Sequence, residues 1–137
     1  MDNRDLIKKA LEAKKKAHVP YSNFRVGAAL ITDDGKVFTG CNIEISSYSP
    51  TICAERTAIF KAISEGHKKI KAIAVVGDSD FTYPCGVCRQ VIREFGKDAT
   101  IIVANSEDDY REHKLEDLLP YSFGPEDLEN SRSEEDV

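Results

Sequence analysis

The sequence predicts an α/β/α sandwich, in which a mixed β-sheet is covered by helices. Two observations indicate this class: a β-hairpin pattern over residues 24–44, and a regular alternation of helical and strand patterns after it. The 137 residues are 41% hydrophobic, which suits a single core. We expect one folded domain over residues 1–124 and an acidic, mobile tail over residues 125–137.

A helix is predicted first, over about residues 5–17, with Asn3 as its cap. Its apolar residues recur with the period of a helix, and its lysines line the opposite face. The apolar stripe consists of Leu6, Ile7, Ala10, Leu11, Ala13 and Ala17.

A β-hairpin follows, with strands over residues 24–32 and 36–44 around the turn sequence Asp-Asp-Gly. Strand side chains alternate between two faces, so Asn42 and Glu44 should point the same way, opposite to Cys41. The hairpin therefore presents two polar side chains together. On its first strand, one face consists of Phe24, Val26, Ala28 and Leu30.

The rest of the chain alternates between helices and strands. A loop rich in Ser, Tyr and Pro over residues 45–52 comes first. The predicted elements are a helix over 53–66, a buried strand over 70–78, a helix over 86–96, a strand over 99–105, a weaker strand or loop near 109–113, and a short helix over 115–120.

Charge and hydropathy limit the function classes. The formal net charge is −5 and the sequence pI about 5.2, which disfavours nucleic-acid binding and suits a small, weakly charged substrate. No apolar run approaches the length of a membrane span, and the N-terminal residues lack the apolar centre of a secretory signal. We expect a cytoplasmic protein that binds neither nucleic acid nor membrane.

Three of the four cysteines form a pattern typical of catalytic zinc. Cys53 opens one predicted helix, and Cys85 and Cys88 open another. Helix N-termini favour thiolates, the form that zinc needs. Three protein ligands leave one coordination position open for water, which distinguishes a catalytic site from a closed structural site. We therefore expect one Zn²⁺ per chain.

The neighbours of these cysteines have ordinary interpretations as well. Cys41 could be a fourth ligand, but its apolar surroundings favour a small core residue. Arg56 is either a solvated helix residue or a donor to the sulfurs, where it would offset the net charge of three thiolates on Zn²⁺. Glu55 is either an exposed helix glutamate or a proton carrier beside the metal. The three histidines receive no role.

The spacing Cys85-Gly-Val-Cys88 also occurs in redox proteins and structural zinc knuckles. A thioredoxin-like oxidoreductase would leave Cys53 and zinc dispensable. A noncatalytic zinc-stabilised interaction module would close the fourth ligand position and tolerate substitution of Glu55. The third cysteine and the glutamate favour a zinc deaminase, a class in which zinc on three cysteines activates water and a non-ligand glutamate moves protons.

The sequence closely resembles the small, homotetrameric, zinc-dependent cytidine deaminases over nearly the whole chain, up to about Phe123. The segments that carry this resemblance, in the order and approximate spacing of the family, are PYSNFRVGAAL, GCNIE, CAERTAIFKA, PCGVCRQ and LEDLLP. It implies a sandwich of the cytidine deaminase type, with residues 1–124 as the catalytic domain. The implied enzyme is a hydrolase acting on a cyclic amidine C–N bond. It would deaminate cytidine, and also deoxycytidine, through a zinc-bound hydroxide, in pyrimidine salvage.

The same resemblance implies the role of each site residue. Zinc would be held by Cys53, Cys85 and Cys88, with Glu55 as proton shuttle and Arg56 compensating the thiolates. The implied substrate contacts are Phe24 on the pyrimidine, Asn42 and Glu44 on the ribose hydroxyls, and the Ala54 backbone at the base.

A homotetramer with shared active sites is also implied, in which Tyr48 and Phe123 reach a neighbouring subunit's pocket. The chain's small size agrees with this, because few of its own side chains remain to close over a nucleoside. Ser46 stands where the family pattern has alanine, and it receives no role. A deaminase of another aminated heterocycle, such as a nucleoside antibiotic or a tRNA base, is the rival within the fold.

Overall fold

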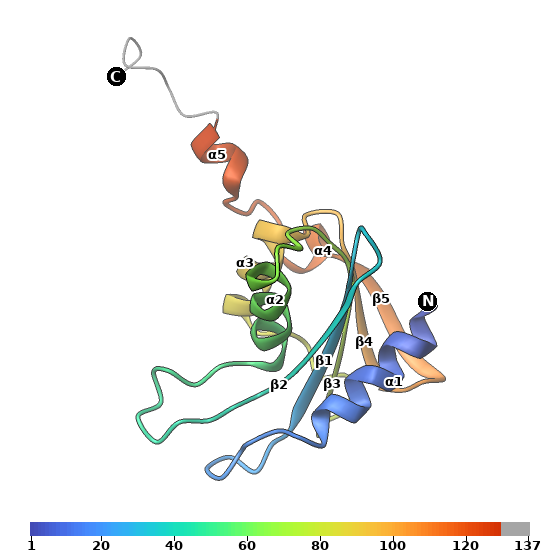
Figure 1. Ribbon diagram of the computed structural model, residues 1–137, viewed down its shortest axis with the longest axis vertical. Coiled ribbons are helices and arrows are strands. Elements are labelled where there is room, and N and C mark those ends of the chain that lie inside the picture. Colours follow the sequence, from blue (N-terminus) through green and yellow to red (C-terminus); the bar gives the residue numbers. More distant parts are fainter. Residues whose placement is uncertain (130–137) are drawn as a thin grey trace.

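The computed structural model describes residues 1–129 and contains a five-stranded mixed sheet (Figure 1). The strands are β1 (Val26–Thr32), β2 (Val37–Cys41), β3 (Ile70–Gly77), β4 (Thr100–Ser106) and β5 (Asp109–Lys114). They lie in the order β2-β1-β3-β4-β5, in which β3 and β4 run parallel and the other neighbouring pairs are antiparallel. The predicted mixed sheet is therefore confirmed, and the uncertain segment near residue 109 is a strand.

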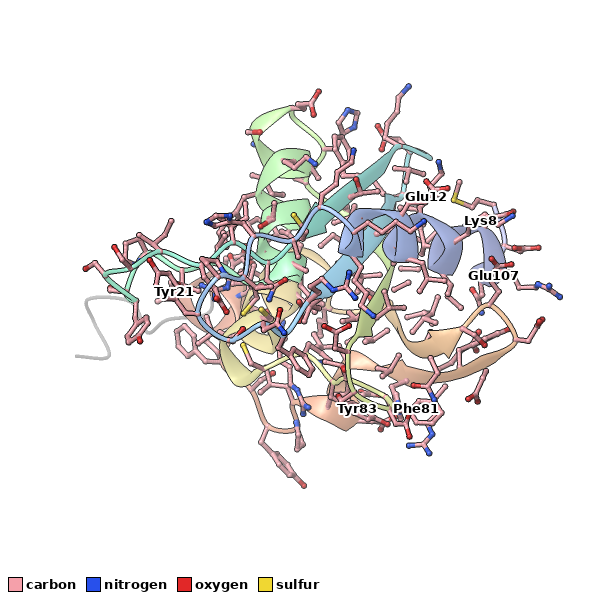
Figure 2. All side chains as sticks on the ribbon, turned by 90° about the horizontal axis from the view of Figure 1, so that it is seen from below. Lys8, Glu12, Tyr21, Phe81, Tyr83 and Glu107 are labelled. Atoms are coloured by element: carbon pink, nitrogen blue, oxygen red, sulfur yellow. The ribbon has the colours of Figure 1, made fainter. Side chains whose placement is uncertain are left out.

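Helices cover both faces of the sheet (Figure 1). The helix α1 (Asn3–Lys14) packs on one face, where Ile7 and Ala10 meet Ala29, Ala74 and Ile102. The other face packs against the helices α2 (Ala54–Ser64), α3 (Gly86–Phe95) and α4 (Leu115–Leu118). This is the predicted α/β/α sandwich. Figure 2 shows Lys8 and Glu12 on the outer side of α1, as its amphipathic pattern predicts.

The cap of α1 differs from the prediction. Asp2 rather than Asn3 is the N-cap, because its carboxylate accepts a hydrogen bond of 2.9 Å from the Asp5 amide.

The helix α1 lies so close to β1 that a Cβ on Gly27 would stand 2.1 Å from the carbonyl oxygen of Ala10. Glycine at this position is what allows the helix to lie on the sheet.

β2 ends earlier than predicted. It stops at Cys41, and beyond it only Ile43 forms isolated bridges, one with His18 and one with Ile52. Through these bridges the loop before β1 and the loop before α2 run side by side and project together from one end of the molecule (Figure 1). Asn42 and Glu44 therefore lie at this loop end rather than within a strand.

The segment predicted as a mobile tail begins with a short helix, α5 (Pro125–Glu129). This helix is connected to α3 through an ion pair between Glu126 and Arg93. Residues 130–137 of the predicted tail lie outside the described residues. Within residues 1–129, no helix is long and apolar enough to cross a membrane.

Candidate active site

The two helices that cover one face of the sheet bring three cysteines together. Cys53 is the N-cap of α2, Cys85 is the N-cap of α3, and Cys88 lies in the first turn of α3. Their sulfur atoms all lie within 4.8 Å of one another. The 31 intervening residues thus fold so that two helix N-termini meet, as the sequence predicts.

The geometry of this cluster fits a zinc ion. Ligand sulfurs about 2.3 Å from a tetrahedral zinc stand about 3.8 Å apart, and the sulfurs of Cys53 and Cys85 are separated by 3.8 Å. A group of three thiols is also the donor set that zinc prefers. Cys41 is half-buried and outside this group, so among the described residues the cluster has three sulfur ligands.

The pKa values of the Cys53 and Cys88 thiols are shifted in opposite directions. A hydrogen bond from the Cys88 thiol, followed by the Arg56 guanidinium, lowers the pKa of Cys53 to about 5, against an opposing effect of burial. The same bond with Cys53, burial and the charge of Glu55 raise the pKa of Cys88. Cys53 is therefore the more acidic of these two thiols, and its sulfur accepts a hydrogen bond from the Cys88 thiol.

Arg56 lies one turn after Cys53 and interacts with it directly. Its Nη2 donates a hydrogen bond of 3.3 Å to the Cys53 sulfur, while its Nε is buried without a partner among the described residues. The hydrogen bond to Cys53 also raises the pKa of the guanidinium. A permanent positive charge therefore sits against the sulfur cluster, where three thiolates would leave zinc with a net negative site.

Glu55 is a buried carboxyl group beside the cluster, with only 3% of the residue exposed. Burial, assisted by the negative charge of Cys53, raises the pKa of Glu55 to about 7. An ordinary exposed helix glutamate would not show either property. A carboxyl group with this pKa can both accept and donate a proton near neutral pH.

The predicted sugar contacts are held at the loop end of the molecule. Asn42 Oδ1 accepts a hydrogen bond of 2.9 Å from the Val26 amide, and its Nδ2 donates one of 2.9 Å to the Phe24 carbonyl. Glu44 accepts hydrogen bonds from the amides of Tyr21 (3.0 Å) and Ser22 (3.1 Å). Both side chains thus face the segment that carries Phe24.

Two residues that position Phe24 were missed by the sequence analysis. Ser22 donates from its hydroxyl to Glu44 and accepts a hydrogen bond of 3.0 Å from the Phe24 amide. Asp78 accepts a hydrogen bond of 2.7 Å from the Arg25 amide and is paired with Lys14 at 2.8 Å. The serine two positions before Phe24 offered a signal, since Ser hydroxyls often bond nearby amides. Nothing in the sequence singled out Asp78.

The predicted residues of the shared pocket are not assembled within one chain. Tyr48 is 74% exposed on the projecting loop. Its ring meets that of Tyr21 (Figure 2) edge-on, with 6.2 Å between the ring centroids. Phe123 is 58% exposed after α4. Ala54, in contrast, is fully buried as the first residue of α2, directly beside the cysteines.

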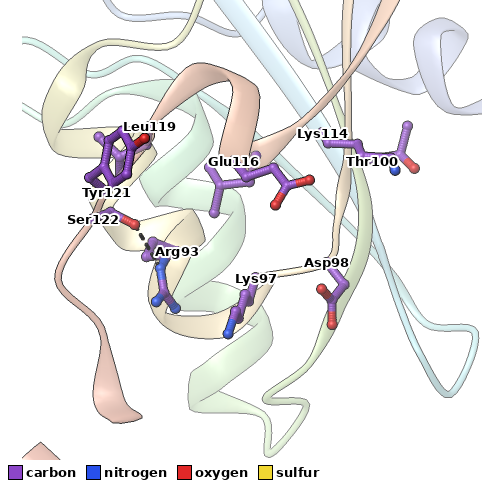
Figure 3. A pocket seen from close by; sticks show the side chains of 10 residues that line it. Arg93, Lys97, Asp98, Thr100, Lys114, Glu116, Leu119, Tyr121 and Ser122 are labelled. Carbon is purple, nitrogen blue, oxygen red and sulfur yellow. Dashed lines mark hydrogen bonds between the residues drawn. The ribbon is translucent and has the colours of Figure 1, made fainter. Parts of the chain in front are cut away.

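A cavity of about 400 Å³ lies away from the cysteines (Figure 3). It is bordered by the end of α3, by α4 and by the segment that follows α4. None of the predicted site residues lines it. Its walls include Arg93, Lys97, Thr100, Lys114, Tyr121 and Ser122.

Comparisons with known proteins agree with a zinc site at the three cysteines. Residues 1–104 match the family described as "Cytidine and deoxycytidylate deaminase zinc-binding region". A cytidine deaminase of Sporosarcina psychrophila is 49% identical over 130 residues, covering 93% of this chain and 96% of the relative. A cytidine deaminase of Mycobacterium tuberculosis is 44% identical over 124 residues, covering 90% of each chain.

Solved structures give the same result. The crystal structure of cytidine deaminase from Burkholderia pseudomallei superposes with a TM-score of 0.85 at 49% identity, covering 90% of this chain and 100% of that one. The family match spans most of the chain, and the cysteine cluster lies within it. This chain belongs to the cytidine deaminase family.

Proposed function

We propose that the chain hydrolyses cytidine, and also deoxycytidine, to the corresponding uridine nucleoside and ammonia, as a step of pyrimidine salvage. The observation that carries this proposal is the meeting of three sulfurs within 4.8 Å beside a buried glutamate. The family match and the cytidine deaminases among its relatives support the same reaction. A noncatalytic module or a dithiol oxidoreductase would have no use for a buried Glu55.

Cys53, Cys85 and Cys88 would hold the zinc ion. When bound, zinc supplies Lewis-acid activation of the attacking water. Glu55 takes a proton from this water and delivers it to the ring nitrogen next to C4 as oxygen adds to that carbon. It then transfers the second proton to the amino group, which leaves as ammonia while the C4 carbonyl forms. Cytidine and water thus become uridine and ammonia, with no other reactant.

The remaining hydrogen-bonding capacity of Asn42 and Glu44 suits a sugar. Asn42 uses one of its two donors and one of two acceptor positions on the Phe24 segment, which leaves one of each for a hydroxyl. Glu44 accepts three bonds of about four that a carboxylate can accept. The hydrogen bond from the Ser22 hydroxyl lowers the pKa of Glu44, and burial opposes this effect only in part. The Glu44 carboxyl group is therefore charged at neutral pH.

A charged carboxylate near the sugar favours hydroxyl groups and repels phosphate. The test is an absorbance assay with cytidine, deoxycytidine and cytidine 5′-monophosphate. The specificity constant for cytidine should far exceed that for the monophosphate. Comparable specificity constants for cytidine and its monophosphate would contradict the nucleoside assignment. If neither compound were turned over, the proposed deamination itself would be contradicted.

We infer further that the enzyme is a cytoplasmic homotetramer whose active sites are shared, with Tyr48 and Phe123 entering a neighbouring subunit's pocket. Exposed aromatic rings on projecting segments support this, since such rings are common at protein interfaces. Co-refolding of two strongly impaired variants, Glu55→Gln and Phe123→Ala, tests it. Mixed tetramers should regain activity. No recovery despite proven chain exchange would rule the shared site out.

A further inference from the structure

The segment that carries Phe123 is held to the body of the protein by few apolar contacts. Tyr121, Phe123 and Leu128 are all largely exposed. On the inner side of this segment, Tyr121 and Ser122 border the cavity of about 400 Å³ rather than a packed core. Polar contacts must therefore fix where Phe123 stands.

Arg93 supplies most of these contacts from α3. Its side chain is 8% exposed, and its Nε donates a hydrogen bond of 2.8 Å to the Ser122 hydroxyl (Figure 3). Its Nη1 donates one of 3.3 Å to Glu126, and its Nη2 pairs with the other oxygen of that carboxylate. One guanidinium thus binds the chain on both sides of Phe123.

The backbone at Phe123 is fixed to the same helix. Gln90 donates a hydrogen bond of 2.8 Å from Nε2 to the Phe123 carbonyl. Directly after it, the chain passes so close to Arg93 that a Cβ on Gly124 would stand 2.5 Å from the guanidinium carbon. A Cβ at this position would push the guanidinium away from its present bonds to Ser122 and Glu126.

We propose that Arg93 is a positioning residue, which clamps residues 122–126 onto α3 and so presents the Phe123 ring to the active site of a neighbouring subunit. This inference rests on the proposed function and its shared sites. It gives Glu126, within the acidic segment, a role as the counter-ion of the clamp. Because α3 also carries Cys85 and Cys88, the helix that holds metal ligands for one site would orient an aromatic wall for another.

Glu126→Gln is the appropriate variant, because substitution of the buried Arg93 could simply prevent folding. The amide keeps the shape of Glu126 but removes the charge that balances the guanidinium. Glu129→Gln is the matched control, with the same chemical change at an exposed position of the same helix. Zinc content and tetramer assembly are measured for every variant.

Glu126→Gln should raise KM for cytidine about tenfold, with kcat within about twofold of the parent, because the wall is displaced while the chemistry is intact. In a Phe123→Ala background the same substitution should have no further effect. Glu129→Gln should match the parent. Chymotrypsin should cleave after Tyr121 or Phe123 faster in Glu126→Gln than in Glu129→Gln, which reports the clamp without any assay of turnover.

Any of three results would overturn the clamp alone. The first is an unchanged KM in Glu126→Gln, and the second is a loss of kcat/KM in the double variant equal to the losses of Glu126→Gln and Phe123→Ala combined. The third is equal chymotrypsin cleavage of Glu126→Gln and Glu129→Gln. A parent that does not turn over cytidine would instead overturn the proposed function, and with it the catalytic purpose of the clamp. The two failures are therefore distinguishable.

Discussion

Arg56 donates a hydrogen bond of 3.3 Å from Nη2 to the sulfur of Cys53, the residue that caps the same helix. This bond places a permanent positive charge on a cluster that becomes strongly anionic when all three thiols ionise. The pKa of Cys53 is lowered to about 5 by its bond with Cys88 and by this guanidinium. We therefore expect Arg56 to affect the electrostatics of the cluster more than the stability of the fold.

Arg56→Gln should lower kcat/KM for cytidine about 10-fold to 100-fold, the usual cost of losing a group that orients a metal ligand. The thermal midpoint should change much less, because Arg56 as a whole residue is partly exposed. Arg4→Gln, which removes an exposed surface ion pair with Asp108, is the control. Unchanged turnover and zinc affinity in Arg56→Gln would show that the bond has no function.

Glu55→Gln should keep zinc and fold but lose about a hundredfold to ten-thousandfold in kcat, because the amide matches the carboxyl group in shape and cannot carry protons. Because Glu55 acts in two proton transfers, we expect a loss of kcat near the upper end of this range. Steady-state kinetics and metal analysis of the purified variant provide the check. A loss of less than about tenfold would exclude Glu55 as the proton carrier.

The same carboxyl group should make the stability of the zinc-free protein depend on pH. Burial raises the pKa of Glu55 from 4.5 to about 7, so the folded state holds this proton longer than the unfolded state. The stabilisation is complete below pH 4.5 and is lost as pH rises to 7, by about 3 kcal/mol in total.

Zinc-free Glu55→Gln should thus equal the parent in unfolding free energy near pH 4.5 and exceed it by about 3 kcal/mol at pH 8. Urea unfolding in the presence of a chelator and a reductant measures both values. A difference between the two proteins that stays constant across this range would contradict the raised pKa.

Gly27→Ala should destabilise the fold by about 1–3 kcal/mol or more, because the new Cβ must displace α1 from β1. Gly86→Ala is the matched control, since a Cβ there meets no atom within 4 Å. Thermal unfolding of the zinc-loaded proteins should separate the two variants. Equal midpoints would mean that α1 packs less closely on the sheet than described.

Local patterns predicted most of the fold. The hairpin followed from the Asp-Asp-Gly turn, where Gly35 has a φ of +86°, and the core helices followed from their apolar period. The cap of α1 was placed one residue late because Asp2 and Asn3 are both good capping residues. β2 was predicted too long because bonds to the Phe24 segment, rather than strand pairing, orient Asn42 and Glu44.

The cysteine cluster could be predicted because its residue types and spacing are rare. The clamp could not, since Arg93 and Glu126 are separated by 33 positions in a chain that is 31% charged. Many pairings of opposite charge are compatible with such a sequence. Only the tertiary fold selects one, and the same holds for Lys14 with Asp78.

The requirement for zinc on the three cysteines is tested most directly by one experiment on metal content and turnover. Purified protein is assayed for zinc and for loss of cytidine absorbance, before chelation, after chelation and after zinc is restored, beside the double variant Cys85→Ala, Cys88→Ala. We predict about one zinc per chain, activity that disappears with the metal and returns with it, and a double variant that retains neither. Full cytidine turnover by metal-free protein, or tight zinc in the double variant, would contradict the account.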